Sequence, residues 1–263
     1  MLHTQYAQLA MHLGERDRGR EHARAALPVM ERLGAKDDAV QLRSLLVLCA
    51  VSEGRLEDAE AELERIAAVD DAGVFGGIGV RRTGAAEVAL ARGDHAGGLR
   101  AYRECAASMS ELRLPGVPAT GLEPWATFGY ATALTAHAYY ATGADDAHGW
   151  KLFGVCRERA GRLLELAAPY LDFPAAGMVL FSLGAWSLLR GEGDPEPSLR
   201  LLALADRFAY NRTVPTMAWE RIAPHAERRA PGRIAQLRAA YSDRRPRDLL
   251  DEARLAATGG ACS

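Results

Sequence analysis

The architecture follows from one segment, Glu53-Gly54-Arg55-Leu56-Glu57-Asp58-Ala59-Glu60-Ala61-Glu62-Leu63. Gly54 stands between two helix-forming runs, and a glycine there adopts the left-handed conformation that closes a tight turn. Ala59 is small and comes early in the second run, so it lets two helix backbones approach closely. Leu63 and Ile66 follow on the same helical face and fill the groove between the helices. The segment therefore predicts two helices joined by a glycine turn.

The same unit occurs four times when the chain is aligned on its turn glycines, Gly14, Gly54, Gly93 and Gly143. The position five residues later is small in three of the four units: Gly19, Ala59, Gly98 and His148. The positions nine and twelve residues later carry side chains that can fill a groove: Ala23, Leu63, Tyr102, Leu152, Ala26, Ile66, Cys105 and Val155. A fifth unit is expected to turn at 191–195. The sequence therefore predicts an array of helical hairpins.

This repeat resembles the helical hairpins of the tetratricopeptide superfamily. Its glycines lie 40, 39, 50 and 48 residues apart, whereas the standard unit has roughly 34 residues, so we expect longer helices or longer connections. Ala and Leu supply 84 of the 263 residues, and Val, Ile and Thr supply only 26, too few for a β-sandwich or barrel. We predict an all-α fold, a tetratricopeptide-like α-solenoid of about six helical hairpins wound as a right-handed superhelix.

We expect a single array over residues 1–257 and a disordered tail at 258–263. Regular hairpins fill 1–113, and an aromatic-rich half fills 125–257. Between them, three prolines and two glycines make 114–124 an irregular loop. The expected helices are 2–13, 18–33, 36–53, 56–69, 77–92, 95–112, 124–142, 145–168, 174–190, 196–209, 216–229, 232–242 and 247–257.

The formal net charge of −2 gives no general reason to bind nucleic acid or an anionic membrane. Residues 207–254 are different, because they hold eleven Arg and six acidic residues. Since the acidic residues are interspersed among the arginines, we interpret this segment as a basic helical surface. Direct contact with DNA is not expected.

The compartment is predicted from the cysteines and from the most apolar stretches. Cys49, Cys105, Cys156 and Cys262 form no CxxC pair, which suits a reducing compartment. The N-terminus lacks the regions of a signal peptide. Pro124–Ala144 is apolar but contains Pro, Gly and His, and Phe173–Leu189 has only 17 residues, so both are expected as core helices. We predict a cytoplasmic protein that does not associate with membranes.

No motif supports a catalytic, cofactor or metal site. The pairs Asp37-Asp38, Asp70-Asp71 and Asp145-Asp146 do not complete a DDxxD metal motif. They are expected at helix starts, where carboxylates meet the positive end of the helix dipole. The glycine-rich stretch 71–82 lacks the lysine motif of a phosphate loop and is interpreted as a loop between repeats. No HExxH is present. We therefore expect no enzyme activity, no cofactor and no metal.

A candidate groove comes from the aromatic residues, which concentrate between 125 and 186. If some of them line the concave face of a solenoid, they form a groove for a peptide or a small molecule. The candidate groove residues are Trp125, Tyr130, His137, Tyr139, Tyr140 and Trp150. The alternative is that the aromatic residues fill the core and that His137 is a hydrogen-bonded core histidine.

Three C-terminal segments carry a further resemblance: Leu201–Trp219, Glu220–Leu237 and Tyr241–Ala253. They resemble the helical-repeat region of large bacterial transcriptional regulators of the antibiotic-regulatory-protein type. In that family a winged-helix DNA-binding domain and an activation domain come first, a nucleotide-binding domain often follows, and a tetratricopeptide-like array closes the chain. The present chain has no phosphate-binding loop and no winged-helix pattern, so the DNA-binding and nucleotide-binding residues of the family have no counterparts in it.

The resemblance implies a non-enzymatic protein-interaction or sensor module of a bacterial transcriptional regulator. Its expected partner is a protein, either another domain of the regulator or a separate chain, with a small-molecule inducer as a further candidate. Two alternatives stay open. One is an all-helical enzyme with a pocket around His137, and the other is a stand-alone tetratricopeptide-like scaffold.

Overall fold

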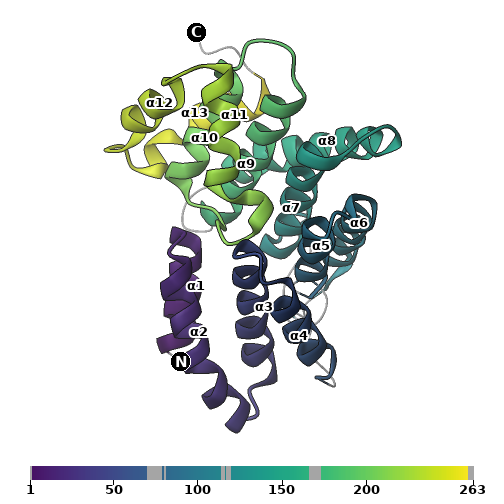
Figure 1. Ribbon diagram of the computed structural model, residues 1–263. Helices are drawn as coiled ribbons and strands as arrows, with labels where there is room; N and C mark the ends of the chain where they lie inside the picture. The colour runs from purple at the N-terminus through teal and green to yellow at the C-terminus, as the bar shows by residue number, and fades with distance from the viewer. Residues whose placement is uncertain are drawn as a thin grey trace. The chain divides into compact units, whose positions relative to one another are not determined.

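The computed structural model describes residues 2–69, 79, 81–113, 116, 120–165 and 173–259 (Figure 1). Within these ranges the regular structure consists of thirteen α-helices and two short 3-10 helices, with no strand. The all-α prediction is therefore confirmed for the described residues. The chain divides into two compact units. Unit 1 is Met1–Leu112 with Asn211–Pro215, and unit 2 is Arg113–Tyr210 with Thr216–Ser263.

Unit 1 contains helices that pack in chain order. They are α1 (Leu2–Leu13), α2 (Arg16–Arg32), α3 (Lys36–Ser52), α4 (Leu56–Ala67), α5 (Arg81–Ala91) and α6 (His95–Glu111). α1, α2, α3, α4 and α5 each pack on the helix that follows. In addition, α1 contacts α3 and α3 contacts α5. Successive helix pairs thus stack on their sequence neighbours, as they do in helical-repeat proteins.

The described links between the helices of unit 1 share one backbone geometry. Each has a glycine with positive φ: +78° at Gly14, +66° at Gly34, +73° at Gly54 and +86° at Gly93. In each link two backbone N–H groups donate to the end of the preceding helix, as Gly54 donates to Val51 O and Arg55 to Ala50 O. This arrangement satisfies carbonyls that would otherwise lack a partner at a helix end. The predicted left-handed turns are confirmed, including Gly143 with a φ of +57°.

The long repeat period comes from long helices. α2 and α3 have 17 residues each, and a link of three residues around Gly34 joins them. Gly34, which lies 20 residues from both Gly14 and Gly54, is not among the predicted turn glycines. The link at Gly34, which joins two successive hairpins, therefore has the same backbone geometry as the links at Gly14 and Gly54, which lie within hairpins.

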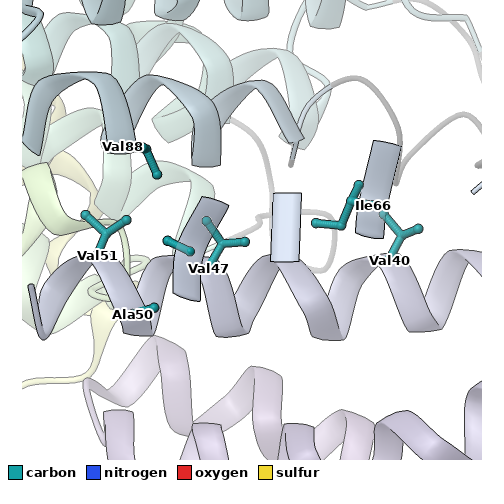
Figure 2. Packing of buried hydrophobic residues seen from close by; sticks show 7 residues of the cluster. Val40, Val47, Ala50, Val51, Ile66 and Val88 are labelled. Carbon is teal, nitrogen blue, oxygen red and sulfur yellow. The ribbon is translucent and has the colours of Figure 1, made fainter. Parts of the chain in front are cut away.

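Small residues bring the helices of unit 1 together. A Cβ atom on Gly19 would lie 2.4 Å from the sulfur of Met11, and one on Gly98 would lie 2.6 Å from Leu90. At the third equivalent position, Ala59 is fully buried. It belongs to an apolar cluster from α3, α4 and α5 that contains Val40, Val47, Ala50, Val51, Ile66 and Val88 (Figure 2).

Unit 2 departs from strict chain order. Its α-helices are α7 (Pro124–Tyr140), α8 (Ala144–Glu165), α9 (Phe173–Arg190), α10 (Glu196–Phe208), α11 (Trp219–Arg229), α12 (Arg233–Tyr241) and α13 (Leu250–Thr258). The short 3-10 helices are η2 (Pro215–Met217) and η3 (Pro246–Leu249). α7 packs on α8 and α9, and α9 packs on α10. α12 and α13 then pack on α10, and α13 also packs on α8. The C-terminal helix thus returns to an earlier hairpin.

The two apolar stretches of the sequence form central helices of unit 2. Residues 131–138 of α7 are all buried. α9 approaches the end of α10 so closely that a Cβ atom on Gly177 would lie 1.7 Å from the carbonyl oxygen of Ala209. Among the described helices, none is both long enough and apolar enough to cross a bilayer.

The fourth hairpin differs from the other three at the small-residue position. His148, five residues after Gly143, is exposed, and the buried small residue is its neighbour Gly149. A Cβ atom on Gly149 would lie 2.2 Å from the ring of Trp186. Because α8 begins directly after Gly143, Gly149 is the sixth residue of its helix, whereas Gly19, Ala59 and Gly98 are the fourth residues of theirs.

Several predicted features lie wholly or partly outside the described residues. They are Asp70-Asp71, most of the glycine-rich stretch 71–82, residues 114, 115 and 117–119 of the irregular loop, Cys262 and residues 260–263 of the predicted tail.

A pair of glycine substitutions tests the turn geometry. Gly54→Ala should lower the free energy of unfolding by about 1 kcal/mol, because no atom obstructs a Cβ there but φ is +73°. Gly154→Ala should raise it by roughly 0.5–1 kcal/mol, because Gly154 lies inside α8 with open space around it. Urea unfolding followed by circular dichroism measures both. Equal effects of the same sign would contradict the left-handed link.

Candidate functional site

The structure distributes the predicted groove residues among separate clusters of unit 2. Tyr139 and Tyr140, at the end of α7, lie under Arg221 of α11. The guanidinium carbon is 4.3 Å from the Tyr139 ring centre and 4.8 Å from that of Tyr140. Arg221 also donates to the Tyr140 hydroxyl at 2.5 Å. His225 packs edge-on against Tyr139 at 6.0 Å. Arg221 of α11 therefore covers one face of each tyrosine ring.

Burial and nearby charges set the protonation states of this cluster. Burial raises the pKa of the Tyr139 phenol well above its usual range, although the charge of Arg221 opposes the shift. Burial lowers the pKa of His225, and the nearby charges of Arg228 and Arg221 lower it further. Both groups therefore stay neutral at pH 7, and their contacts are those of a packed aromatic–arginine cluster.

Trp150 belongs to a second cluster. It is 57% exposed, and its ring meets the buried Trp186 ring edge-on at 5.2 Å and the Phe153 ring at 5.8 Å. Trp186 in turn occupies the space left open by Gly149. Trp150 is therefore an exposed aromatic anchored to the interface between α8 and α9.

Tyr130 and Trp125 lie nearer the start of α7 and are both half-buried. The Arg159 guanidinium of α8 sits 4.6 Å from the Tyr130 ring centre. This contact crosses the hairpin of α7 and α8 and is of the cation–π kind.

His137 has no exposed surface. Its Nδ1 atom lies 2.8 Å from the carbonyl oxygen of Ala133, one helical turn earlier. An acid or base in a reaction must reach a ligand or solvent, and this imidazole is enclosed by the core. The position agrees with the interpretation of His137 as a core histidine.

The end of α7 is held by Arg190, the last residue of α9, which the sequence analysis did not single out. Its guanidinium donates to the carbonyl oxygens of His137 and Ala138 at 2.9 Å and of Ala141 at 2.7 Å. It also pairs with Asp146 in the first turn of α8 at 3.3 Å. One side chain thus satisfies the carbonyls at the end of α7 and connects three helices.

The remaining candidates for chemistry have structural positions. Cys49, Cys105 and Cys156 are buried free thiols, and burial raises the pKa of Cys49 to about 11 and that of Cys156 to about 12. Asp37-Asp38 and Asp145-Asp146 lie in the first turns of α3 and α8, as predicted. Among the described residues, no group of three or more His, Cys, Asp or Glu side chains is placed to hold a metal ion.

Two cavities open in unit 1, in the groove between α2 and α4 that has α3 as its floor. The first, the arginine cavity, has a volume of about 250 Å³. Its apolar base is formed by Leu46, Ala50 and Ala61. Its charged walls are Arg20 and Arg24 from α2, Arg55 from the link, and Asp58, Glu62 and Arg65 from α4.

The arginines of this cavity differ in how far they are already paired. Arg20 pairs with Asp17 and Glu53, Arg55 pairs with Glu53 and Asp58, and Arg65 pairs with Glu62. Arg24 is exposed and has no hydrogen-bond or ion-pair partner among the described residues. The cavity therefore presents one guanidinium whose donors are all available.

The second, the apolar cavity, has a volume of about 300 Å³. It is lined largely by Met30, Ala35, Ala39 and Val69, with Glu31, Lys36, Arg43 and Arg65 at its walls. Arg43 of α3 reaches across the groove and pairs with Glu31 of α2 and Glu62 of α4. Arg65 borders both cavities, so they lie next to each other along the groove.

The groove between α2 and α4 was not predicted from the sequence, because no sequence motif corresponds to it. The nearest sequence signal is the pair Arg20 and Arg24, which lie one turn apart in α2 and therefore share a face. The arginines on the opposite wall come from another hairpin, and their proximity depends on how α2, α3 and α4 pack.

No protein-family model, no curated protein and no solved structure matches this chain. Its function is therefore inferred from its own residues.

Replacing Arg190 tests how the aromatic clusters are held in place. Arg190→Met should lower the free energy of unfolding by about 2–3 kcal/mol, because the carbonyls at the end of α7 lose their charged donor. Arg157→Met is the control, since Arg157 is exposed and its ring contact with Phe153 spans 5.9 Å. It should change the value by less than about 0.5 kcal/mol. Equal urea midpoints for the two variants would show that Arg190 does not stabilise unit 2.

Proposed function

We propose that the chain is a non-enzymatic interaction module of a bacterial transcriptional regulator, built as a tetratricopeptide-like right-handed solenoid of about six helical hairpins. It holds a protein partner, which is another domain of the regulator or a separate protein. Binding favours one arrangement of the regulator over another and so controls its activity. Contact with DNA belongs to other domains.

The observation that carries this proposal is the packing of unit 1. Its helices contact their sequence neighbours through the same glycine link, and they leave a groove that is open to solvent between α2 and α4. Stacked helix pairs generate extended surfaces of this kind, which helical-repeat proteins use to bind other chains. The resemblance of 201–253 to a family of regulators supports the same assignment.

The positions of the reactive side chains support a non-enzymatic role. The described cysteines are buried thiols whose pKa is raised by burial. His137 is enclosed in the core and bonded to a backbone carbonyl. None of these groups lines the two cavities of the groove of unit 1. The free thiols also support a cytoplasmic location.

The proposal is tested by mixing the purified chain with the winged-helix regulator encoded in its genomic neighbourhood. We expect a stoichiometric complex by size-exclusion chromatography with light scattering. We also expect the chain to change the regulator's affinity for its promoter in fluorescence anisotropy, and to leave the promoter DNA unbound when it is added alone. The lack of any regulator domain in the same reading frame and in that neighbourhood, or direct binding of the promoter by the isolated chain, would contradict the proposal.

A further inference from the structure

The groove of unit 1 combines a charged cavity and an apolar cavity in a fixed order. The arginine cavity lies over the C-terminal half of α3, at Leu46 and Ala50. The apolar cavity lies over its N-terminal half, at Lys36, Ala39 and Arg43. A single segment lying along α3 would therefore meet both.

The arginine cavity fits a carboxylate. Arg24 stands on the α2 wall with its donors available, and Arg65 stands on the α4 wall with a single ion pair, to Glu62. A guanidinium binds a carboxylate through two parallel hydrogen bonds, and such charged bonds are stronger than neutral ones. The carboxylates that line this cavity, Asp58 and Glu62, are each paired with an arginine.

The available guanidinium of Arg24 gives the direction of recognition. Four arginines and two carboxylates line the cavity, and Asp17 and Glu53, outside that lining, offset the charges of Arg20 and Arg55. Among the described residues, the lining group left without an ion pair is the arginine Arg24. A basic segment would be repelled there, and an acidic segment would be attracted. Because Arg24 is exposed, this attraction is screened by salt.

The apolar cavity fits one aliphatic side chain. Its volume of about 300 Å³ is bounded by Met30, Ala39 and Val69, with charged side chains at its walls. A leucine that enters it leaves water and contacts an apolar surface. Arg43 crosses the groove between the walls and separates this cavity from the charged one.

The distance between the two cavities determines how far apart along a ligand the two side chains that enter them must be. The α3 residues of the two cavities are centred about nine residues apart, which at 1.5 Å per residue is about 13 Å along the helix. An extended peptide advances about 3.3 Å per residue. Four residues of an extended peptide therefore span the distance.

We propose that the groove between α2 and α4 binds an extended acidic peptide segment. Its acidic side chain enters the arginine cavity and contacts Arg24. An aliphatic side chain four residues away enters the apolar cavity. The inference deepens the proposed function, on which it rests, by naming the class of segment that the partner presents.

The test uses the full chain and two fluorescein-labelled peptides that differ in direction. One is Gly-Ser-Leu-Ser-Ala-Ser-Glu-Ser-Gly and the other is the reversed sequence. We expect saturable binding of one of them in fluorescence anisotropy, and weaker binding at higher salt. Replacing Glu by Gln in the peptide, or Arg24→Ala in the chain, should each weaken binding about tenfold. The two changes together should weaken it no further, because they remove the same contact.

Arg18→Ala is the matched control. Arg18 is an exposed arginine of α2 that pairs with Glu15 and does not line the cavity, so its loss should leave peptide affinity unchanged. Circular dichroism should show the same unfolding midpoint for Arg24→Ala and the wild type, since Arg24 forms no ion pair with the described residues. The Gln peptide repeats the test without altering the protein.

Two results would overturn the inference: no saturable binding of either peptide up to about 1 mM, or equal peptide affinities of the wild type and Arg24→Ala. Its failure is separable from that of the proposed function. If the regulator is bound equally by the wild type and Arg24→Ala, the groove assignment fails and the interaction module stands. If peptide binding requires Arg24 but no regulator is bound, the groove stands and the regulatory role fails.

Discussion

A link of two or three residues with a glycine at positive φ is the constraint on which unit 1 depends. The left-handed residue turns the chain back within three residues, and its N–H and that of the next residue close the end of the preceding helix. Because Gly14, Gly34 and Gly54 are evenly spaced, α2 and α3 have the same length, and each packs on its sequence neighbours. The groove between α2 and α4 is a consequence, since α3 separates those two helices and forms its floor.

In unit 2, a side chain supplies hydrogen-bond donors to the carbonyls at the end of a helix. α7 ends without a left-handed glycine directly after it, since Ala141 is extended, and Arg190 supplies the donors that the glycine link supplies in unit 1. The solution depends on residues about fifty positions apart in the sequence. Unit 2 is also less regular, since α13 returns to pack on α8.

The helices of the described residues could be predicted from sequence because their determinants are local. Helix-forming runs and turn glycines decide where helices begin and end. For this reason both predicted ends of α1 (Leu2–Leu13) and the predicted start of α7 at Pro124 agree with the structure. The site could not be predicted in the same way. Tyr139 and Tyr140 are common groove residues by type, but Arg221 of α11 covers one face of each ring. The arginine cavity is assembled from two hairpins, so the meeting of Arg24 and Arg65 depends on packing and not on spacing.

The most direct measurement of the central claim is solution NMR of the full chain. Backbone chemical shifts and couplings report φ at the link glycines, and nuclear Overhauser contacts report which helices are neighbours. The account predicts positive φ at Gly14, Gly34, Gly54 and Gly93, with contacts in residues 2–112 between consecutive helices and between alternate ones. Negative φ at these glycines, or contacts that join α1 directly to α6, would contradict it.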